Sequence, residues 1–299
     1  MIKLKNMENI KYSNLNWDIQ NASYGDYERQ KLDIAFPKKE RANAIIYIHG
    51  GAYFTGNKSE YPEFLSDYAK DNVIASIDYR VIEELNNIHM GDILLDLNNV
   101  IVKIIELSYL NNVKINELIL IGHSAGGHIG LLYGYKYPMN IAACISLAGP
   151  TDFSDDLGWS SMPMWGKDMK ERLIFMSWMG SRLAKFSIEL KQFNWTKQDN
   201  YSIFEKYINE ISPIMYVNKQ NKIPPTLLVH ARGDDQVPYS NAIRLKNALD
   251  NNNVINKLIT PEGFADNHML GGVVYKEASP IFFNCQWVNE AKTWLEGFL

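Results

Sequence analysis

Short apolar runs that alternate with longer helical patterns restrict the fold of this chain more than any other feature of its sequence. Between the runs, apolar residues recur at helical spacing from Ile93 to Ile105 and from Ala242 to Leu249. Near-continuous apolar runs are typical of strands buried on both faces of a parallel sheet. Five such runs, with Ile255–Ile259 as a further strand near the far edge, are Ala44–Ile48, Val73–Ile77, Leu118–Ile121, Ala142–Leu147 and Thr226–Val229. The alternation predicts the α/β class, with a mostly parallel central sheet and helices on both faces.

The size of the chain favours a single domain. With 299 residues, of which 46% are apolar, the chain can bury one large core, and α/β folds of this length often form one domain. We therefore expect residues 1–299 to form one domain. Near the N-terminus, Tyr24-Gly25 predicts a turn, and Gln30–Ile34 ahead of Pro37 predicts a strand at an antiparallel edge of the sheet.

One passage, at about 154–211, breaks the alternation of strands and helices. A loop of that length without structure is improbable in a compact domain, so an inserted helical lid is expected. The passage is rich in Trp and Met. These side chains either pack the lid onto the body or form an apolar wall of the substrate pocket, and both interpretations can hold together. The candidates for that wall, together with Tyr53 from an earlier loop, are Trp159, Trp165 and Trp178.

Charge and composition argue against several classes of protein. The formal net charge of −4 shows no basic surplus, so nucleic acid is a poor partner. We find no apolar stretch that fits a signal peptide or a membrane span. The only cysteines, Cys144 and Cys285, lie in apolar contexts. They are expected to be buried free thiols and not a disulfide or a metal pair, which fits a cytoplasmic setting, and no cofactor is expected.

A serine between two glycines carries the first indication of chemistry. Gly122-His-Ser-Ala-Gly126 fits the G-x-S-x-G pattern, after the strand run Leu118–Ile121 and before the helical run His128–Tyr137. A nucleophile elbow requires this context, because the glycines leave room for a sharp turn that lifts the Ser124 Oγ above the sheet edge. Glycines that only let strand and helix pack closely would leave the serine unexplained. Ser124 is the predicted nucleophile.

A serine hydroxyl is a weak nucleophile until a base accepts its proton, so a histidine and a carboxylate are also required. Where the serine lies on a nucleophile elbow, the three residues follow one another along the chain in the order serine, acid, histidine. After Thr226–Val229 the chain places Asp234 and Asp235 at the carboxyl end of a strand, where α/β ligand sites form. Only His268 lies beyond this acidic loop, and it is the predicted base. The histidines that adjoin the elbow and the strand ends more often satisfy local backbone groups; they are His49, His123, His128 and His230.

The loop that follows Ala44–Ile48 carries a second functional element, His49-Gly-Gly-Ala-Tyr53. Its two glycines let backbone N–H groups approach a ligand oxygen that side chains would otherwise obstruct. Such a loop predicts an oxyanion hole, together with the N–H of Ala125 after the nucleophile. Each donor of this kind stabilises the charge that develops on a carbonyl oxygen by roughly 3 kcal/mol.

Together these residues resemble the α/β-hydrolases, and within them the esterases with a His-Gly-Gly loop. The resemblance is to hormone-sensitive-lipase-like carboxylesterases and kynurenine formamidases, and it covers most of the chain. The segments that carry it are Tyr24-Gly25, Leu32–Ile34, His49–Gly51, Asp78–Arg80, Gly122–Gly127, Gly149–Phe153, Ser212-Pro213, Pro225–Leu228 and Asp234 four residues before Pro238. In the relatives the acid stands in an Asp-x-x-Val-Pro context, which selects Asp234 and leaves Asp235 as a turn or helix-capping residue. The relatives' oxyanion donors correspond to Gly51 and Ala52.

These residues together indicate acyl transfer by a serine hydrolase with an α/β-hydrolase fold. We expect it to cleave small-molecule carboxylic esters of small-to-medium acyl groups through a Ser-His-Asp triad and an acyl-enzyme. An arylformamidase or another amide hydrolase would use the same triad, and Ala52 decides for neither group of relatives. A ligand-binding receptor on the same scaffold is a third possibility, against which the retention of Ser124, Asp234 and His268 argues. Relatives often dimerise, which leaves a homodimer open.

Overall fold

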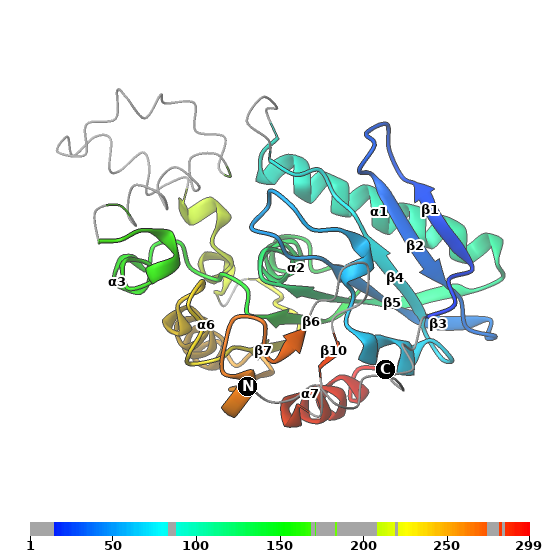
Figure 1. Ribbon diagram of the computed structural model, residues 1–299. Helices are drawn as coiled ribbons and strands as arrows, with labels where there is room; N and C mark the ends of the chain where they lie inside the picture. Colours follow the sequence, from blue (N-terminus) through cyan, green and yellow to red (C-terminus); the bar gives the residue numbers. More distant parts are fainter. Residues whose placement is uncertain are drawn as a thin grey trace, which may run out of the picture.

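The computed structural model describes residues 15–82, 88–168, 171, 183, 208–218, 221–273, 281–282 and 285–299. These residues include an eight-stranded sheet with the order β1-β2-β4-β3-β5-β6-β7-β8 (Figure 1). Its strands are β1 (Ile19–Ser23), β2 (Lys31–Ala35), β3 (Arg41–Ile48), β4 (Val73–Ile77), β5 (Lys114–His123), β6 (Ile141–Leu147), β7 (Thr226–Val229) and β8 (Asn256–Ile259). Only the pairs that involve β2 are antiparallel. A separate antiparallel pair joins β9 (Gly272–Val273) to β10 (Ile281–Phe282).

The prediction of a mostly parallel sheet is confirmed, and all six predicted parallel strands are present. The strand expected over Gln30–Ile34 is β2, and it is antiparallel as predicted. It is not the edge of the sheet, however, because β1 pairs with its outer side. The β1 sequence Ile-Gln-Asn-Ala-Ser is short and largely polar, so it lacks the apolar pattern that would have indicated a strand.

Helices cover both faces of the sheet, as expected for the α/β class (Figure 1). The α-helices are α1 (Met90–Leu110), α2 (Ala125–Lys136), α3 (Asp156–Ser160), α6 (Tyr239–Asn251) and α7 (Gln286–Glu296). Short 3-10 helices are Lys58–Glu60, Glu63–Tyr68, Pro163–Trp165, Pro213–Tyr216 and Gly263–Ala265. Helices α1 and α6 contain the two patterns of helical spacing found in the sequence, and α2 contains most of the predicted helical run His128–Tyr137, whereas α7 was not predicted.

The two faces of β3 show why its sequence is apolar throughout. Ile46 and Ile48 belong to the core that includes buried side chains of α1, α2 and α6. Ile45 and Tyr47 point to the opposite core, which includes buried side chains of α7 and of the turn Glu63–Tyr68. Because side chains alternate along a strand, a strand between two helical layers is buried on both faces.

The predicted lid at about 154–211 lies mostly outside the described residues and stays a prediction. The described residues at its two ends are joined to each other. The Phe153 N–H donates to Ser212 Oγ at 3.0 Å, and the Ile214 N–H donates to the Thr151 carbonyl at 3.1 Å. The chain before the passage and the chain after it therefore lie side by side.

Both cysteines are buried free thiols, as predicted. Burial raises the pKa of the Cys144 and Cys285 thiols above the usual value, so both stay protonated near neutral pH. Within the described ranges, we find no helix with the length and apolar character needed to span a bilayer.

A buried carboxylate holds α1 against the loops at one end of the sheet. Asp96, on α1, is fully buried and forms an ion pair with Arg80, whose Nη2 lies 2.7 Å from the carboxylate. The carboxylate also accepts hydrogen bonds from the Arg80 backbone N–H at 2.8 Å and from the Gln30 amide at 2.7 Å. Both carboxylate oxygens of Asp96 are thus satisfied inside a low-dielectric interior.

We expect Asp96→Ala to lower the free energy of unfolding by about 3–5 kcal/mol, because among the described residues it leaves the buried Arg80 with only the partly exposed carboxylate of Asp92, at 3.7 Å, as its acidic partner. The measurement is urea unfolding at neutral pH. As a control, Glu106→Ala removes the exposed pair between Lys103 and Glu106 and should change stability by less than about 1 kcal/mol. Similar losses in the two variants would contradict this account of Asp96.

Candidate active site

Ser124 lies on a strained turn between β5 and α2. Its backbone has φ 52° and ψ −120°, a left-handed conformation that a residue with a Cβ rarely adopts. The Ser124 N–H donates to the Leu147 carbonyl of β6 at 2.7 Å, which holds the turn against the sheet. A Cβ on Gly126 would overlap the Ile48 carbonyl, and a Cβ on Gly122 would overlap Gly126. Both glycines are therefore required for the close approach that presents the serine.

His268 connects Ser124 to Asp234. Its Nε2 lies 3.0 Å from Ser124 Oγ, and its Nδ1 lies 2.9 Å and 3.0 Å from the two carboxylate oxygens of Asp234. Because an ionised carboxylate only accepts hydrogen bonds, the Nδ1–H donates to Asp234 and leaves the Nε2 lone pair facing the serine hydroxyl. The structure thus brings the three predicted catalytic residues together in a geometry suited to proton transfer from Ser124.

The surroundings of Asp234 keep its carboxylate ionised. Burial alone would raise its pKa, but the hydrogen bonds and the electrostatic attraction of His230 and His268 outweigh burial and hold the pKa well below its usual range. The backbone N–H groups of Gln236 and Val237 add two hydrogen bonds of 2.9 Å. Asp235, the competing candidate, is exposed, and α6 begins after Pro238, so Asp235 belongs to the turn.

Asp266 links the acid loop to the loop that carries the base. Its carboxylate accepts a hydrogen bond of 2.6 Å from the Gly233 N–H, next to Asp234. The 3-10 turn Gly263–Ala265 precedes it, after β8. Sequence reasoning did not identify this contact, because nothing in the spacing of the two loops indicates which carboxylate reaches across.

The predicted oxyanion loop follows β3 and lies directly against the elbow. A Cβ on Gly50 would stand 3.3 Å from the Ser124 Cβ. The N–H groups of Phe54 and Thr55 both donate to the Gly51 carbonyl at 3.0 Å, which forms a tight turn. The N–H groups of Gly51, Ala52 and Ala125 have no acceptor among the described residues. They are available to a ligand oxygen, and the N–H of Ala125 also lies at the positive end of the α2 dipole.

Gly51 and its neighbours adopt unusual backbone angles. Gly51 has φ 102°, Ala52 φ 51°, Tyr53 φ 71° and Gly56 φ 92°. A left-handed conformation costs roughly 1–2 kcal/mol at a residue with a side chain. The strain at Ala52 and Tyr53 must therefore be held by contacts elsewhere in the loop.

His49 and Arg29 hold the two ends of this loop. The His49 ring is fully buried, donates from Nδ1 to the Gly50 carbonyl at 2.7 Å, and stacks on Tyr79 with a centroid distance of 4.3 Å. Arg29 donates to the Gly56 carbonyl at 2.6 Å and lies 3.5 Å from His49 Nε2. Burial, with the charge of Arg29, lowers the pKa of His49 to about 3, so the ring stays neutral.

The prediction that four histidines satisfy local backbone groups is confirmed for His49 and His230, whereas His123 and His128 contact distant backbone groups. Each ring lies within hydrogen-bond distance of a carbonyl: His49 of Gly50 at 2.7 Å, His123 of His268 at 3.0 Å, His128 of Ile211 at 2.6 Å and His230 of Val237 at 3.0 Å. Two of these carbonyls are far away in the sequence. His123 thereby supports the backbone of the predicted base, and His128 supports the end of the passage at about 154–211.

The four predicted pocket residues have different environments. Tyr53 and Trp159 are each only 2% exposed and belong to the hydrophobic core. Trp165 is partly exposed, and its ring N–H donates to the Gln236 carbonyl at 2.6 Å, close to the acid loop. Trp178 lies outside the described residues. Their role as a substrate wall stays a prediction.

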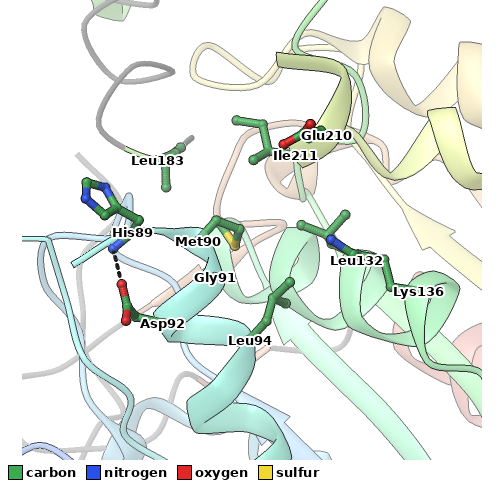
Figure 2. Close-up of a pocket in the computed structure, with 10 residues that line it drawn as sticks. All are labelled: His89, Met90, Gly91, Asp92, Leu94, Leu132, Lys136, Leu183, Glu210 and Ile211. Carbon is green, nitrogen blue, oxygen red and sulfur yellow. Dashed lines mark hydrogen bonds between the residues drawn. The ribbon is translucent and has the colours of Figure 1, made fainter. Parts of the chain in front are cut away.

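A cavity of about 410 Å³ lies away from these residues, between the start of α1, α2 and the end of the passage at about 154–211 (Figure 2). Its lining mixes apolar and charged side chains, namely His89, Met90, Gly91, Asp92, Leu94, Leu132, Lys136, Leu183, Glu210 and Ile211. None of the predicted site residues is among them.

The parallel sheet, the elbow and the order serine, aspartate, histidine define an α/β-hydrolase-type esterase. A family model described as BD-FAE matches residues 32–249, and the chain belongs to this family of α/β-hydrolase-type esterases. It is thus a carboxylesterase-type hydrolase. A comparison with curated protein sequences found no match.

Solved structures share the fold at low sequence identity. Esterase B from Lactobacillus rhamnosis has a TM-score of 0.68 and 16% identity, over 94% of this chain and 84% of the esterase. A truncated carbohydrate esterase from gut microbiota has a TM-score of 0.63 and 20% identity, over 87% and 92%. A thermophilic esterase from the planctomycete Thermogutta terrifontis, solved with butyrate bound, has a TM-score of 0.63 and 17% identity, over 93% and 94%. At these identities the likeness shows the fold alone.

Because buried histidines stay neutral in the folded protein, we expect the protein to become less stable as the pH decreases. His49 and His128 are fully buried, and burial lowers their pKa values to about 3 and about 4. An unfolded chain protonates these rings below pH 6.5, whereas the folded protein does not until near pH 4. Their full contribution to stability is therefore present above pH 6.5. Each ring lowers the free energy of unfolding by about 2 kcal/mol when the pH decreases from 7 to 5.

Urea unfolding at pH 7 and pH 5 measures this loss. In His128→Asn, which lacks one of the two rings, the difference between the two pH values should shrink by about 2 kcal/mol. An unchanged pH difference in this variant would contradict the depressed pKa of His128.

Proposed function

We propose that the protein hydrolyses carboxylic esters of small-to-medium acyl groups through a Ser-His-Asp triad and an acyl-enzyme intermediate. The observation that carries the proposal is the pair of contacts, 3.0 Å and 2.9 Å, that join Ser124 Oγ through His268 to Asp234. A serine, a neutral imidazole and a buried carboxylate in this order are the requirements for an activated hydroxyl nucleophile.

In the first half of the reaction, Ser124 Oγ attacks the ester carbonyl carbon while His268 Nε2 accepts the hydroxyl proton. The carbonyl oxygen becomes an oxyanion, which the N–H groups of Gly51, Ala52 and Ala125 stabilise. The tetrahedral intermediate then expels the alcohol, and the imidazolium of His268 returns the proton to the leaving oxygen. Asp234 stabilises the imidazolium throughout these steps.

In the second half, water attacks the acyl-enzyme. His268 Nε2 accepts a proton from the water, and the same N–H groups hold the second oxyanion. Collapse of this intermediate releases the carboxylic acid and returns the proton to Ser124 Oγ. The atoms balance as one ester and one water converted into one acid and one alcohol.

The substrate class is supported by the neighbours and by the composition of the chain. The Thermogutta esterase was solved with butyrate, a short acyl group, and the gut-microbiota neighbour is described as a carbohydrate esterase. The net charge of −4 and the Trp- and Met-rich passage at about 154–211 favour a neutral, partly apolar substrate. We propose short acyl esters of an apolar or sugar-like alcohol.

Ser124→Ala should lower kcat for p-nitrophenyl butyrate on the order of 10⁴- to 10⁶-fold, because it removes the nucleophile. The matched control is Ser146→Ala, on the adjacent strand β6. Its hydroxyl is buried without a hydrogen-bond partner among the described residues, so this variant should keep the parent rate.

The same assay with acetyl, butyryl and octanoyl esters, beside N-formylkynurenine, measures substrate preference. Faster turnover of the formamide than of every ester would replace the ester proposal by the amide alternative. A Ser124→Ala protein with the parent rate would overturn both, and failure of Ser124 to react with a fluorophosphonate would favour the receptor.

Asp234→Asn and Asp235→Asn separate the two candidate acids. Asp234→Asn should lower kcat by about 10⁴-fold, because an amide that donates to Nδ1 selects the wrong tautomer of His268. Asp235→Asn changes an exposed turn residue and should leave kcat within about twofold of the parent. Steady-state kinetics of both proteins, prepared side by side, gives the result, and a reversed pattern would reassign the acid.

A further inference from the structure

Tyr53 occupies the most strained part of the oxyanion loop. It follows Ala52, and both residues carry side chains in a left-handed backbone conformation, with φ 71° and φ 51°. The Ala52 N–H is one of the three groups available for an oxyanion, so its direction depends on these angles. If the loop relaxed toward ordinary angles, the donor would turn away from the position it must hold.

Two contacts fix Tyr53. Its backbone carbonyl accepts a hydrogen bond of 2.8 Å from the Ile82 N–H, beyond the end of β4. Its side chain is 2% exposed, and the hydroxyl lies 2.8 Å from His128 Nδ1 on the first turn of α2. The rings of Tyr53 and His128 meet edge to face at a centroid distance of 5.6 Å. The loop is therefore tied to the same helix that begins at the nucleophile.

The other side of the His128 ring determines which nitrogen carries the proton. Its Nε2 lies 2.6 Å from the Ile211 carbonyl, which can only accept, so the proton resides on Nε2. The Nδ1 lone pair then faces Tyr53 and accepts a hydrogen bond from its hydroxyl group. The ring is fully buried, with Phe153 edge-on at 5.2 Å, and burial keeps it neutral. The direction of both hydrogen bonds is thereby fixed.

We propose that Tyr53 and His128 are positioning residues, which hold the Ala52 N–H toward the oxyanion through the hydrogen bonds from Tyr53 to His128 and from His128 to Ile211. The proposal rests on the function proposed above. It gives a role to a histidine near the nucleophile that takes no part in proton transfer. Ile211 acts on His128 as Asp234 acts on His268: each accepts a hydrogen bond from one ring nitrogen and so leaves the other nitrogen as the acceptor.

The experiment compares Tyr53→Phe with Tyr135→Phe. Tyr135 lies on α2, like His128, and is as buried as Tyr53, at 2% exposure. Its hydroxyl makes a similar hydrogen bond of 2.9 Å to Thr226 Oγ1, away from the oxyanion loop. Both variants lose one buried hydroxyl, so both should show a similar decrease of Tm. Only Tyr53→Phe should lose kcat for p-nitrophenyl butyrate, by roughly tenfold with KM within about twofold, because a misdirected donor acts on the transition state.

Two substitutions of His128 test the role of the Tyr53–His128 hydrogen bond in a second way. Asparagine can place an acceptor oxygen near the former Nδ1 position, whereas glutamine places its amide near the former Nε2 position. His128→Asn should thus keep a partner for Tyr53 and retain at least about half of the parent kcat. His128→Gln should lose kcat about as far as Tyr53→Phe does, roughly tenfold.

The outcomes are separable. Equal kcat in Tyr53→Phe and Tyr135→Phe would overturn the positioning role, as would a His128→Asn protein that loses more kcat than His128→Gln. If Tyr53→Phe fails to fold, the comparison of the two His128 variants decides. Parent activity in Ser124→Ala would instead refute the proposed function itself, whereas an inactive Ser124→Ala beside a fully active Tyr53→Phe would refute only this inference.

Discussion

The contact on which the rest of the site depends is the close packing of the serine turn against β3. Ser124 adopts a left-handed conformation only because the turn is held by the Leu147 carbonyl on one side and approaches Ile48 through Gly126 on the other. The three strands β3, β5 and β6 are parallel neighbours, so their carboxyl ends meet at this point. The same packing places the predicted oxyanion loop beside the predicted nucleophile, since that loop begins where β3 ends. A single backbone approach thus positions both the proposed attacking atom and the N–H groups proposed to receive the charge.

Buried histidines extend this arrangement into neighbouring loops. A neutral imidazole has one donor and one acceptor nitrogen, so a ring that donates to a carbonyl can also accept from another group. His128 uses both nitrogens to join Tyr53 to Ile211, and His123 supports the backbone of His268. Burial keeps the pKa of these rings near 4. The arrangement therefore remains intact at neutral pH, and it weakens the fold in acid, where the unfolded chain gains protons that the native state excludes.

The sequence predicted those features that leave a local pattern. The runs that became β3 to β7 are apolar because both of their faces are buried, and the elbow is recognisable because close packing excludes side chains at Gly122 and Gly126. The edge strand β1 and helix α7 were missed: β1 is short and mostly polar. The contact of Tyr53 with His128 was also missed, because it joins residues 75 positions apart and neither residue type indicates its partner. Long-range pairs between common residues leave no periodic signal, so only three-dimensional structure reveals them.

Strained backbone angles at the candidate site lower the stability of the folded protein. Ser124, Ala52 and Tyr53 are three residues with side chains in left-handed conformations, at roughly 1–2 kcal/mol each. That sum is a substantial part of the 5–15 kcal/mol by which folded domains are usually stable. Such angles persist only where the surrounding contacts over-determine them, and at this site those contacts are backbone approach at Ser124 and hydrogen bonds at Tyr53. Relief of the strain would stabilise the chain while it loosened the groups that face the oxyanion. The burial of Tyr53 and His128 is thus explained by the need to hold a conformation that the local sequence does not favour.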